Sequence, residues 1–409
     1  MNKSSAIWIA VALAGAGLGA ACSAGSNNGF GGNDSEGTGA SGGATGQTTV
    51  TSGQGGSASS FGNQTSTGSG QPGCDAGADE DQDMDGFTIT QGDCNDCDAN
   101  VNPGAIEVIA DDGQGGGGGV MEPADEDCDG EIDNVPGPCD AGIPLDSADP
   151  MDGARSIELC HPAPTPSDWG VVAAQWVRAN GLPATVNAHM GLLPDFGPNV
   201  ATRAGESMLA ISSGAARDET DPAFCSHSCS YNGAGTPPPG FPQDVPGCSG
   251  GTNINDDVGL ELTLRAPTNA TGYKFNFRFY SNEYPEWVCT TFNDQYITLV
   301  NPAPMGSING NISFDSMNNP VSVNVAFFDV CSGCAAGTNE LVGTGFSTSE
   351  GGTSWLQTSA PIGAGETFSI RFAIWDTGDT AFDSTTLIDN FEWVANGGTV
   401  NVGTIPDPQ

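Results

Sequence analysis

Apolar residues occupy every second position in four stretches of the second half of the chain, and this pattern constrains the fold most strongly. Such alternation is typical of strands that bury one face. The four stretches are residues 260–264, 273–279, 321–327 and 368–374. Turns rich in glycine, asparagine and proline separate them, and no comparable run of helices alternates with them. We therefore predict a mainly β protein built as an antiparallel β-sandwich, rather than a doubly wound α/β fold.

One short helix is expected over residues 169–180. Ser167 and Asp168 suit its N-terminal cap, and Gly181 suits its C-terminal end. At helical spacing, five apolar side chains fall near one face, which predicts core packing there. These side chains are Trp169, Val172, Ala173, Trp176 and Val177.

Basic residues are scarce. The 409 residues contain 50 Asp and Glu but only 9 Lys and Arg, for a formal net charge of −41. Affinity for nucleic acid or anionic lipid comes from clustered lysine and arginine. We therefore expect no nucleic-acid partner, and membrane attachment through a lipid anchor only.

The N-terminus resembles a bacterial lipoprotein signal peptide over residues 1–22. A basic start is followed by an apolar stretch, residues 6–19, which has about the length of a signal h-region, and small residues precede Cys22. The resemblance implies that Cys22 is acylated and becomes the mature N-terminus. The protein would then be exported and held at the bacterial cell envelope, on the outer membrane or cell surface. Cleavage near Ala20 or Ala21 by ordinary signal peptidase is the alternative.

The cysteine count supports export. Removing Cys22 from the thirteen cysteines leaves twelve, an even number that six disulfides can consume. Three close pairs also resemble metal or redox motifs, but we favour structural disulfides in an exported chain. These pairs are Cys94 with Cys97, Cys225 with Cys229, and Cys331 with Cys334.

Composition divides the rest of the chain. Residues 23–73 are rich in Gly, Ser, Thr and Asn and bury too little apolar surface to offset ordering, so we predict a disordered N-terminal tether. An ordered glycine-rich domain is the alternative. The remaining segments are an Asp/Cys-rich metal-binding module (74–140), a proline-rich linker (141–166), the sandwich (167–396) and a C-terminal tail (397–409).

Two acidic loops in the small, disulfide-rich module indicate calcium. Carboxylates at alternate positions followed by glycine can wrap a hard cation that takes 6–8 oxygen ligands. The first loop is not an EF-hand, because position 12 counted from Asp81 is Gly92 rather than Glu, and the second loop is similar to thrombospondin type 3 repeats. Solvated acidic turns without an ion are the alternative. The predicted ligands are Asp81, Asp83, Asp85 and Asp93 in the first loop, and Asp125, Asp127, Asp129 and Asp133 in the second.

The wider module resembles the MopE-type metal-binding motif found in surface proteins of bacteria, notably myxobacteria. The likeness rests on Asp93–Asp96, Asn102–Glu107 and Asp127–Gly130 in that order. It implies a bound metal, and copper has been associated with one member. Because hard oxygen ligands favour Ca²⁺, we predict calcium ahead of copper.

Two further motifs resemble the choice-of-anchor L domain. They are Ser281–Trp287 with Phe292–Asp294, and Ile374–Ser384, while Leu209–Gly214 matches an earlier segment of that family. The likeness spans roughly residues 167–396 and implies a secreted bacterial protein carried by an anchor. It supplies no molecular activity.

The carboxylates of these two motifs follow strand ends. If those ends meet, the carboxylates can hold a second Ca²⁺; if not, they serve as capping and turn residues. The candidates for this second metal site are Glu283, Glu286, Asp294, Asp376, Asp379 and Asp383.

We therefore predict a non-enzymatic, cell-surface-anchored, calcium-binding adhesion or interaction lipoprotein. Its partner would be a surface glycan, a matrix polymer or another surface protein. One alternative is a secreted hydrolase that uses the carboxylates of residues 283–294 and 376–383 on a glycan, as glycosidases use carboxylate pairs. Another is a metal-scavenging protein whose main site is the 74–140 module.

Overall fold

The computed structural model describes residues 77–109, 123–248, 250–325, 327–395 and 398–407, all within the unit formed by residues 69–409. The predicted signal peptide, the lipidation site Cys22 and the tether lie outside the described residues. Among the helices that are described, none has the length and apolar character needed to cross a membrane.

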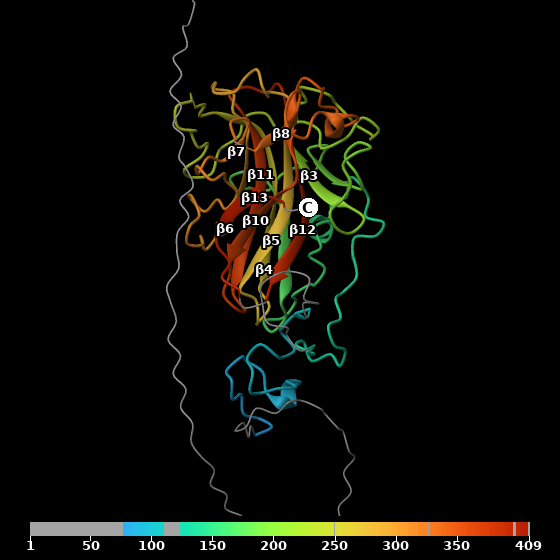
Figure 1. Cartoon of the computed structure of the whole chain (residues 1–409), viewed down its shortest axis with the longest axis vertical. Coiled ribbons are helices and arrows are strands. Elements are labelled where there is room, and N and C mark those ends of the chain that lie inside the picture. The colour runs from blue at the N-terminus through green and yellow to red at the C-terminus, as the bar shows by residue number, and fades with distance from the viewer. Residues whose placement is uncertain (1–76, 110–122, 249, 326, 396–397, 408–409) are drawn as a thin grey trace, which may run out of the picture. The chain divides into compact units, whose positions relative to one another are not determined.

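Two antiparallel sheets form the body of this unit (Figure 1). The first has five strands in the order β1–β4–β11–β6–β7. Their bounds are β1 Gly170–Val177, β4 Ile254–Arg265, β11 Thr367–Thr377, β6 Gln295–Asn301 and β7 Val321–Ser322.

The second sheet has eight strands, six of which follow the order β13–β10–β5–β12–β3–β2. In addition, β9 pairs with both β5 and β8. The bounds are β13 Gly403–Pro406, β10 Leu356–Pro361, β5 Gly272–Ser281, β12 Ser384–Val394, β3 Met208–Ser212, β2 Met190–Leu193, β9 Gly351–Thr353 and β8 Phe328–Cys331. The mainly β, sandwich-like architecture is therefore confirmed.

Aromatic side chains from the two sheets meet in the core. Phe275 and Phe277 of β5 pack against Phe372 of β11 and Tyr296 of β6, with ring centroids 5.2 and 5.1 Å apart. All four rings are fully buried. A buried phenylalanine contributes roughly 1.5–3 kcal/mol relative to an exposed one, so this contact between sheets is a main source of stability.

The helix predicted over residues 169–180 is wrong, because this segment forms strand β1. It pairs antiparallel with β4, and the register shifts between Val171 and Ala173. The irregularity breaks strict alternation: Val171 and Trp176 are buried whereas Val172 is exposed. A strand with such a shift spaces its apolar residues unevenly, which imitates helical periodicity.

Short helices occur outside the sheets. They are a 3₁₀ turn η1 (Ile89–Gln91), helix α1 (Pro150–Arg155) and a 3₁₀ turn η2 (Asn339–Leu341). The strand expected over residues 321–327 ends at Ser322, where a turn begins with the Val325 amide donating to the Ser322 carbonyl. Strand β13 comes from the segment 397–409 that the sequence assigns to a tail, and it pairs with β10.

Five disulfides join described cysteines, as expected for an exported chain. Cys97 is disulfide-bonded as well, and it does not pair with Cys94. The five pairs are Cys94–Cys128, Cys139–Cys160, Cys225–Cys229, Cys248–Cys289 and Cys331–Cys334.

Candidate metal centres

The two acidic loops share one backbone arrangement. In the first, Asp81 Oδ2 accepts a hydrogen bond from the Gly86 amide at 3.1 Å, and in the second, Asp125 Oδ2 accepts one from the Gly130 amide at 3.1 Å. Each glycine has a positive φ, 99° and 95°, which favours a residue without Cβ. The aspartate before each glycine also accepts a hydrogen bond from the amide of the residue that follows the glycine. In the first loop Asp85 accepts from Phe87, and in the second Asp129 accepts from Glu131, both at 2.8 Å. The second loop is thus a structural repeat of the first.

Carboxylate oxygens converge in the first loop. The groups Asp81/Asp83/Asp85 and Asp83/Asp93/Asp96 each have one oxygen per residue within 4.8 Å of the others. Ca²⁺ holds oxygens at 2.3–2.6 Å, so ligands on opposite sides of an ion lie about 4.6–5.2 Å apart. These acidic groups are therefore close enough to share one metal ion.

Several of these oxygens have no other role within the described residues. One carboxylate oxygen each of Asp83, Asp85 and Asp93 is buried without a hydrogen-bond partner. Burial, and then the charges of Asp83 and Asp93, raise the pKa of Asp85 to about 6. A divalent cation would remove both penalties by supplying the missing ligand and neutralising the repulsion.

The second loop gathers its carboxylates around Glu107. This residue belongs to both groups found there, Glu107/Asp125/Asp127 and Glu107/Glu126/Asp133. Its carboxylate accepts hydrogen bonds from the amides of Glu126, Asp127 and Asp133 at 3.1, 3.2 and 2.7 Å. Glu107 therefore orders the second loop and also faces its acidic centre.

Most of the predicted ligands are brought together, with one exception and three additions. Asp129 joins none of the described acidic groups, and its Oδ2 accepts a hydrogen bond from Asn134 Nδ2 at 2.8 Å. Asp96, Glu107 and Glu126 were not predicted as ligands. Asp96 and Glu107 stand in the MopE-like segments, so that motif was a usable signal for both; the spacing of the loop aspartates alone contains no sign of Glu126.

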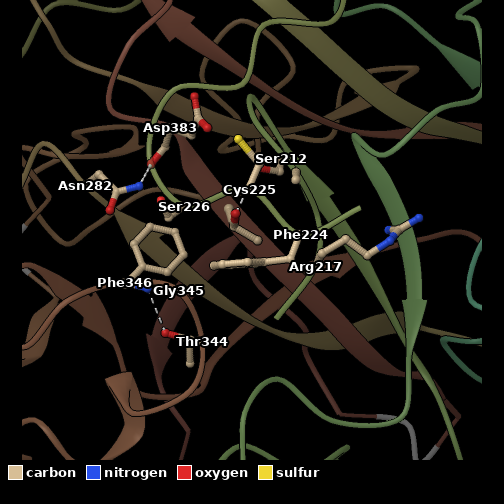
Figure 2. Close-up of a pocket in the computed structure, with 12 residues that line it drawn as sticks. Ser212, Arg217, Phe224, Cys225, Ser226, Asn282, Thr344, Gly345, Phe346 and Asp383 are labelled. Carbon is tan, nitrogen blue, oxygen red and sulfur yellow. Dashed lines mark hydrogen bonds between the residues drawn. The ribbon is translucent and has the colours of Figure 1, made fainter. Parts of the chain in front are cut away.

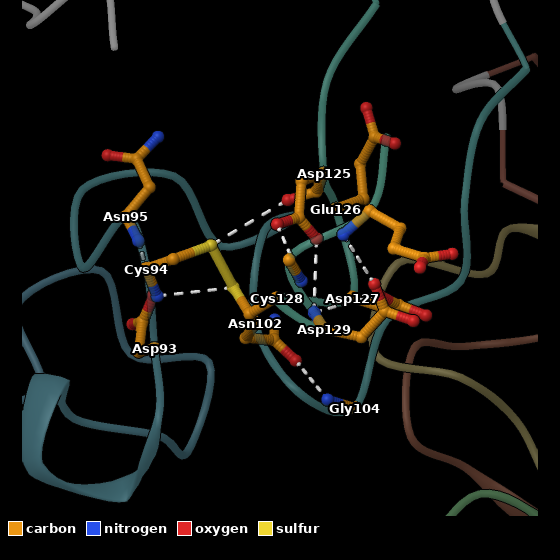
Figure 3. Close-up of a disulfide and its surroundings, with 12 residues drawn as sticks. Asp93, Cys94, Asn95, Asn102, Gly104, Asp125, Glu126, Asp127, Cys128 and Asp129 are labelled. Carbon is orange, nitrogen blue, oxygen red and sulfur yellow. Dashed lines mark hydrogen bonds between the residues drawn. A yellow bond between two sulfur atoms is a disulfide. The ribbon is translucent and has the colours of Figure 1, made fainter. Parts of the chain in front are cut away.

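A disulfide fixes the two loops to each other. Figure 3 shows the Cys94–Cys128 bond between them, next to Asp93 on one side and Asp127 and Asp129 on the other. The Asn102 amide adds a hydrogen bond to the Glu126 carbonyl at 2.8 Å. In a segment with few buried apolar residues, these covalent and polar links take the place of a hydrophobic core.

The six carboxylates predicted for a second site divide into two sets. Glu286 and Asp379 are exposed, whereas Glu283, Asp294, Asp376 and Asp383 are buried, with exposures of 1, 0, 1 and 4%. The buried four, called here the strand-end cluster, lie where β5 and β11 end and where β6 and β12 begin. Neighbours within this set raise each other's pKa, which places them together.

Asp294 is the best-anchored member of the strand-end cluster. Its Oδ1 accepts from the Thr377 amide at 2.9 Å and its Oδ2 from Ser384 Oγ at 2.7 Å. Burial raises its pKa to about 7, opposed by these hydrogen bonds. Burial followed by the charge of Asp294 raises the pKa of Glu283 to about 10.

Asp376 is held differently. Both of its carboxylate oxygens are buried, and among the described residues neither forms a hydrogen bond of good geometry, although Ser213 and Asp294 lie beside them. Burial, and then the charges of Asp294 and Asp383, raise its pKa well above the usual value. No described lysine or arginine forms an ion pair with any member of the strand-end cluster.

A small cavity of about 10 Å³ touches the edge of the strand-end cluster (Figure 2). Asp383, Asn282, Ser212 and Phe346 are among its lining residues. Such a volume has room for about one water molecule. It is far too small for a sugar ring.

Comparison with known proteins identifies part of the chain. Residues 211–391 match the family model of the choice-of-anchor L domain. The match includes both strand-end motifs and all four carboxylates of the strand-end cluster. Together with the disulfides, this match to part of the chain agrees with an exported, surface-anchored protein.

Other comparisons add little. No curated protein matches the chain. Among solved structures, a β-glucosidase from Kluyveromyces marxianus is similar at 11% identity and a TM-score of 0.16, covering 56% of this chain. The chain spans 21% of that protein's length. A similarity this weak supports no conclusion about fold or activity.

Proposed function

We propose that this chain is a non-enzymatic, lipid-anchored surface protein whose Asp/Cys module binds calcium and whose choice-of-anchor L domain contacts a partner outside the cell. The partner would be a glycan, a matrix polymer or another surface protein. The observation that carries the calcium role is the repeated loop geometry, in which carboxylate oxygens converge within 4.8 Å while several lack any other partner.

The choice of metal follows from ligand chemistry. The converging groups contain only Asp and Glu oxygens, with no histidine or thiolate. Hard oxygen ligands suit Ca²⁺, whereas copper prefers imidazole and sulfur. The cysteines beside the loops are engaged in disulfides and are not available as thiolates.

Calcium titration of the mature protein tests this proposal. Asp83→Asn and Asp127→Asn each remove one charged ligand from a converging group, so each should weaken calcium binding at its loop, measured by calorimetry. Glu131→Gln is the matched control, because Glu131 is exposed and joins no described group. Excess chelator should lower the wild-type melting temperature, since a ligand at 100 times its Kd stabilises by about 2.7 kcal/mol.

Two results would contradict the proposal. One is a heat of calcium binding that is identical in the wild type and both Asn variants. The other is copper binding that is tighter than calcium and lost in the same variants, which would favour metal scavenging.

The absence of enzymatic activity is also part of the proposal. Glu283 and Asp376 are 1% exposed, and neither lines the cavity beside Asp383, which holds only about 10 Å³. A glycosidase needs two carboxylates that flank a bound sugar. Glycan hydrolysis by the wild type that disappears in a folded Asp376→Asn variant would favour the hydrolase instead.

A further inference from the structure

We infer that the strand-end cluster is a second, internal site for a divalent cation of the calcium type, with Glu283, Asp294 and Asp376 as its carboxylate ligands. This site lies in the choice-of-anchor L domain and is separate from the acidic loops of residues 81–133. It does not depend on the calcium role proposed for those loops.

The first support is an unbalanced buried charge. Four carboxylates with exposures of 0–4% adjoin one another, and no described lysine or arginine pairs with them. The histidine that faces Asp383, His227, has a side chain 51% exposed to solvent. Buried carboxylates without a cationic partner are strongly destabilising unless they are protonated or bind a metal.

The second support is Asp376, whose two buried oxygens form no hydrogen bond of good geometry, although Ser213 and Asp294 lie beside them. The neighbouring charges of Asp294 and Asp383 show that this carboxylate faces the cluster. Buried polar atoms in folded proteins are nearly always satisfied, so two unpaired oxygens on one carboxylate indicate a missing partner. A cation supplies that partner, and carboxylate oxygens are its usual ligands.

The remaining donors are already oriented. Thr377 and Ser384 hold both oxygens of Asp294, which fixes that carboxylate as a second-shell network fixes a metal ligand. Asn293 adds a neutral candidate ligand, because its buried Oδ1 also lacks a hydrogen bond. In the described structure no three acidic oxygens of this cluster come within 4.8 Å of one another. Binding therefore requires these oxygens to draw closer to one another, with Asp376 moving from its place beside Ser213 and Asp294.

The position of the site gives it a structural consequence. Asp294 precedes β6 of the first sheet, and the Ser384 that bonds it begins β12 of the second. A cation here ties the two sheets together at one end. It also fixes the two loops that carry Trp287, Phe292 and Phe382, whose rings cluster with centroids 5.2 and 6.2 Å from that of Trp287.

Terbium luminescence can report this site alone. Terbium(III) replaces calcium at oxygen sites and emits when an adjacent tryptophan is excited. Trp375 precedes Asp376, and the Trp287 amide donates to the Glu283 carbonyl at 2.9 Å, whereas residues 74–140 contain no tryptophan or tyrosine. The mature protein carrying Asp83→Asn and Asp127→Asn should therefore still give tryptophan-sensitised emission that excess calcium displaces.

Asp376→Asn, added to that protein, should weaken terbium binding by at least the roughly 10- to 100-fold that loss of a supporting group produces. Glu286→Gln is the matched control, because it removes an exposed carboxylate from the same loop and should leave the emission unchanged. The order of the melting temperatures of the parent and the Asp376→Asn protein should also differ between calcium and chelator. In excess calcium the Asp376→Asn protein should melt lower than its parent, and in chelator it should melt at the same temperature or higher, since an unpaired buried charge has gone.

Absence of sensitised emission from the loop-disabled protein would overturn the inference, as would emission equal in Asp376→Asn and Glu286→Gln. If Asp376→Asn does not fold, native mass spectrometry of the loop-disabled protein in calcium decides: one retained ion supports the site, and none rejects it. Failure of the loop proposal would appear separately, as unchanged calcium heat when the loop variants are compared with the wild type.

Discussion

Single buried carboxylates show how local environment sets chemistry in this acidic chain. Asp389 is fully buried and its Oδ2 accepts from the Arg203 amide at 2.5 Å, while Glu158 Oε2 accepts from the Asn390 amide at 2.9 Å. Burial, and then the charge of Asp389, raise the pKa of Glu158 to about 9. Burial raises the pKa of Asp389 to about 6. The pair therefore holds a proton at neutral pH.

This proton makes stability depend on pH. The unfolded chain releases the Glu158 proton near pH 4.5, but the folded chain holds it to about pH 9. The stabilisation is thus fully present below pH 4.5 and is lost as the pH rises toward 9. Glu158→Gln should flatten the fall in the free energy of unfolding between pH 5 and 9. Urea titrations in saturating calcium measure the difference, and an equally steep fall in both proteins would refute the assignment.

At the scale of elements, three long strands were predictable, whereas the edge strands β1 and β13 were not. Residues 260–264, 273–279 and 368–374 lie in β4, β5 and β11, and their alternate apolar side chains pack into the core between the sheets. In β5 the polar residues between them, Asn276 and Arg278, are buried as well. Strand β1 has a register shift against β4, so its apolar residues are unevenly spaced and their pattern wrongly predicted a helix. The strand-end cluster needed tertiary structure, because only pairing of distant strands separates the buried Glu283 from the exposed Glu286 three residues later.

The Cys94–Cys128 disulfide is the element that joins the two acidic loops. The double variant Cys94→Ser/Cys128→Ser frees a segment with a sequence separation of 34 residues. In the chain-entropy model this lowers the stability of the module by about 3–4 kcal/mol. Calcium affinity should fall, because ordering the loops would then oppose binding.

The matching control opens a disulfide away from the loops. Cys225→Ser/Cys229→Ser removes a bridge with a sequence separation of only 4 residues in the sandwich. It should leave loop calcium affinity at the wild-type value in the same calorimetric titration. Equal losses in both double variants would show that the Cys94–Cys128 bond has no specific part in ordering the loops.

For the whole molecule, net charge bears on how the protein can attach to a membrane. A formal net charge of −41 disfavours binding to anionic lipid headgroups, so the proposed membrane attachment is through a covalent lipid. The lipobox-like sequence before Cys22 is the candidate signal, and it lies outside the described residues. Disulfides throughout the described unit agree with maturation outside the cytosol.

Cys22→Ser tests this anchor. The variant should be exported but released from the membrane fraction, because a serine cannot take the thioether-linked lipid. Mass spectrometry of the wild type should show an acylated N-terminal Cys22. Ordinary cleavage near Ala20 or Ala21, with no lipid, would reject the anchor while leaving the calcium proposals intact.

The pairing of β13 with β10 limits how the chain can be shortened. Strand β13 forms the outer edge of the eight-stranded sheet, yet it begins at Gly403, beyond the family match that stops at residue 391. A protein trimmed to the matched segment would bare the amides and carbonyls of β10. Such an exposed strand edge can pair with the strand of another molecule, so we expect the trimmed protein to aggregate or form fibrils.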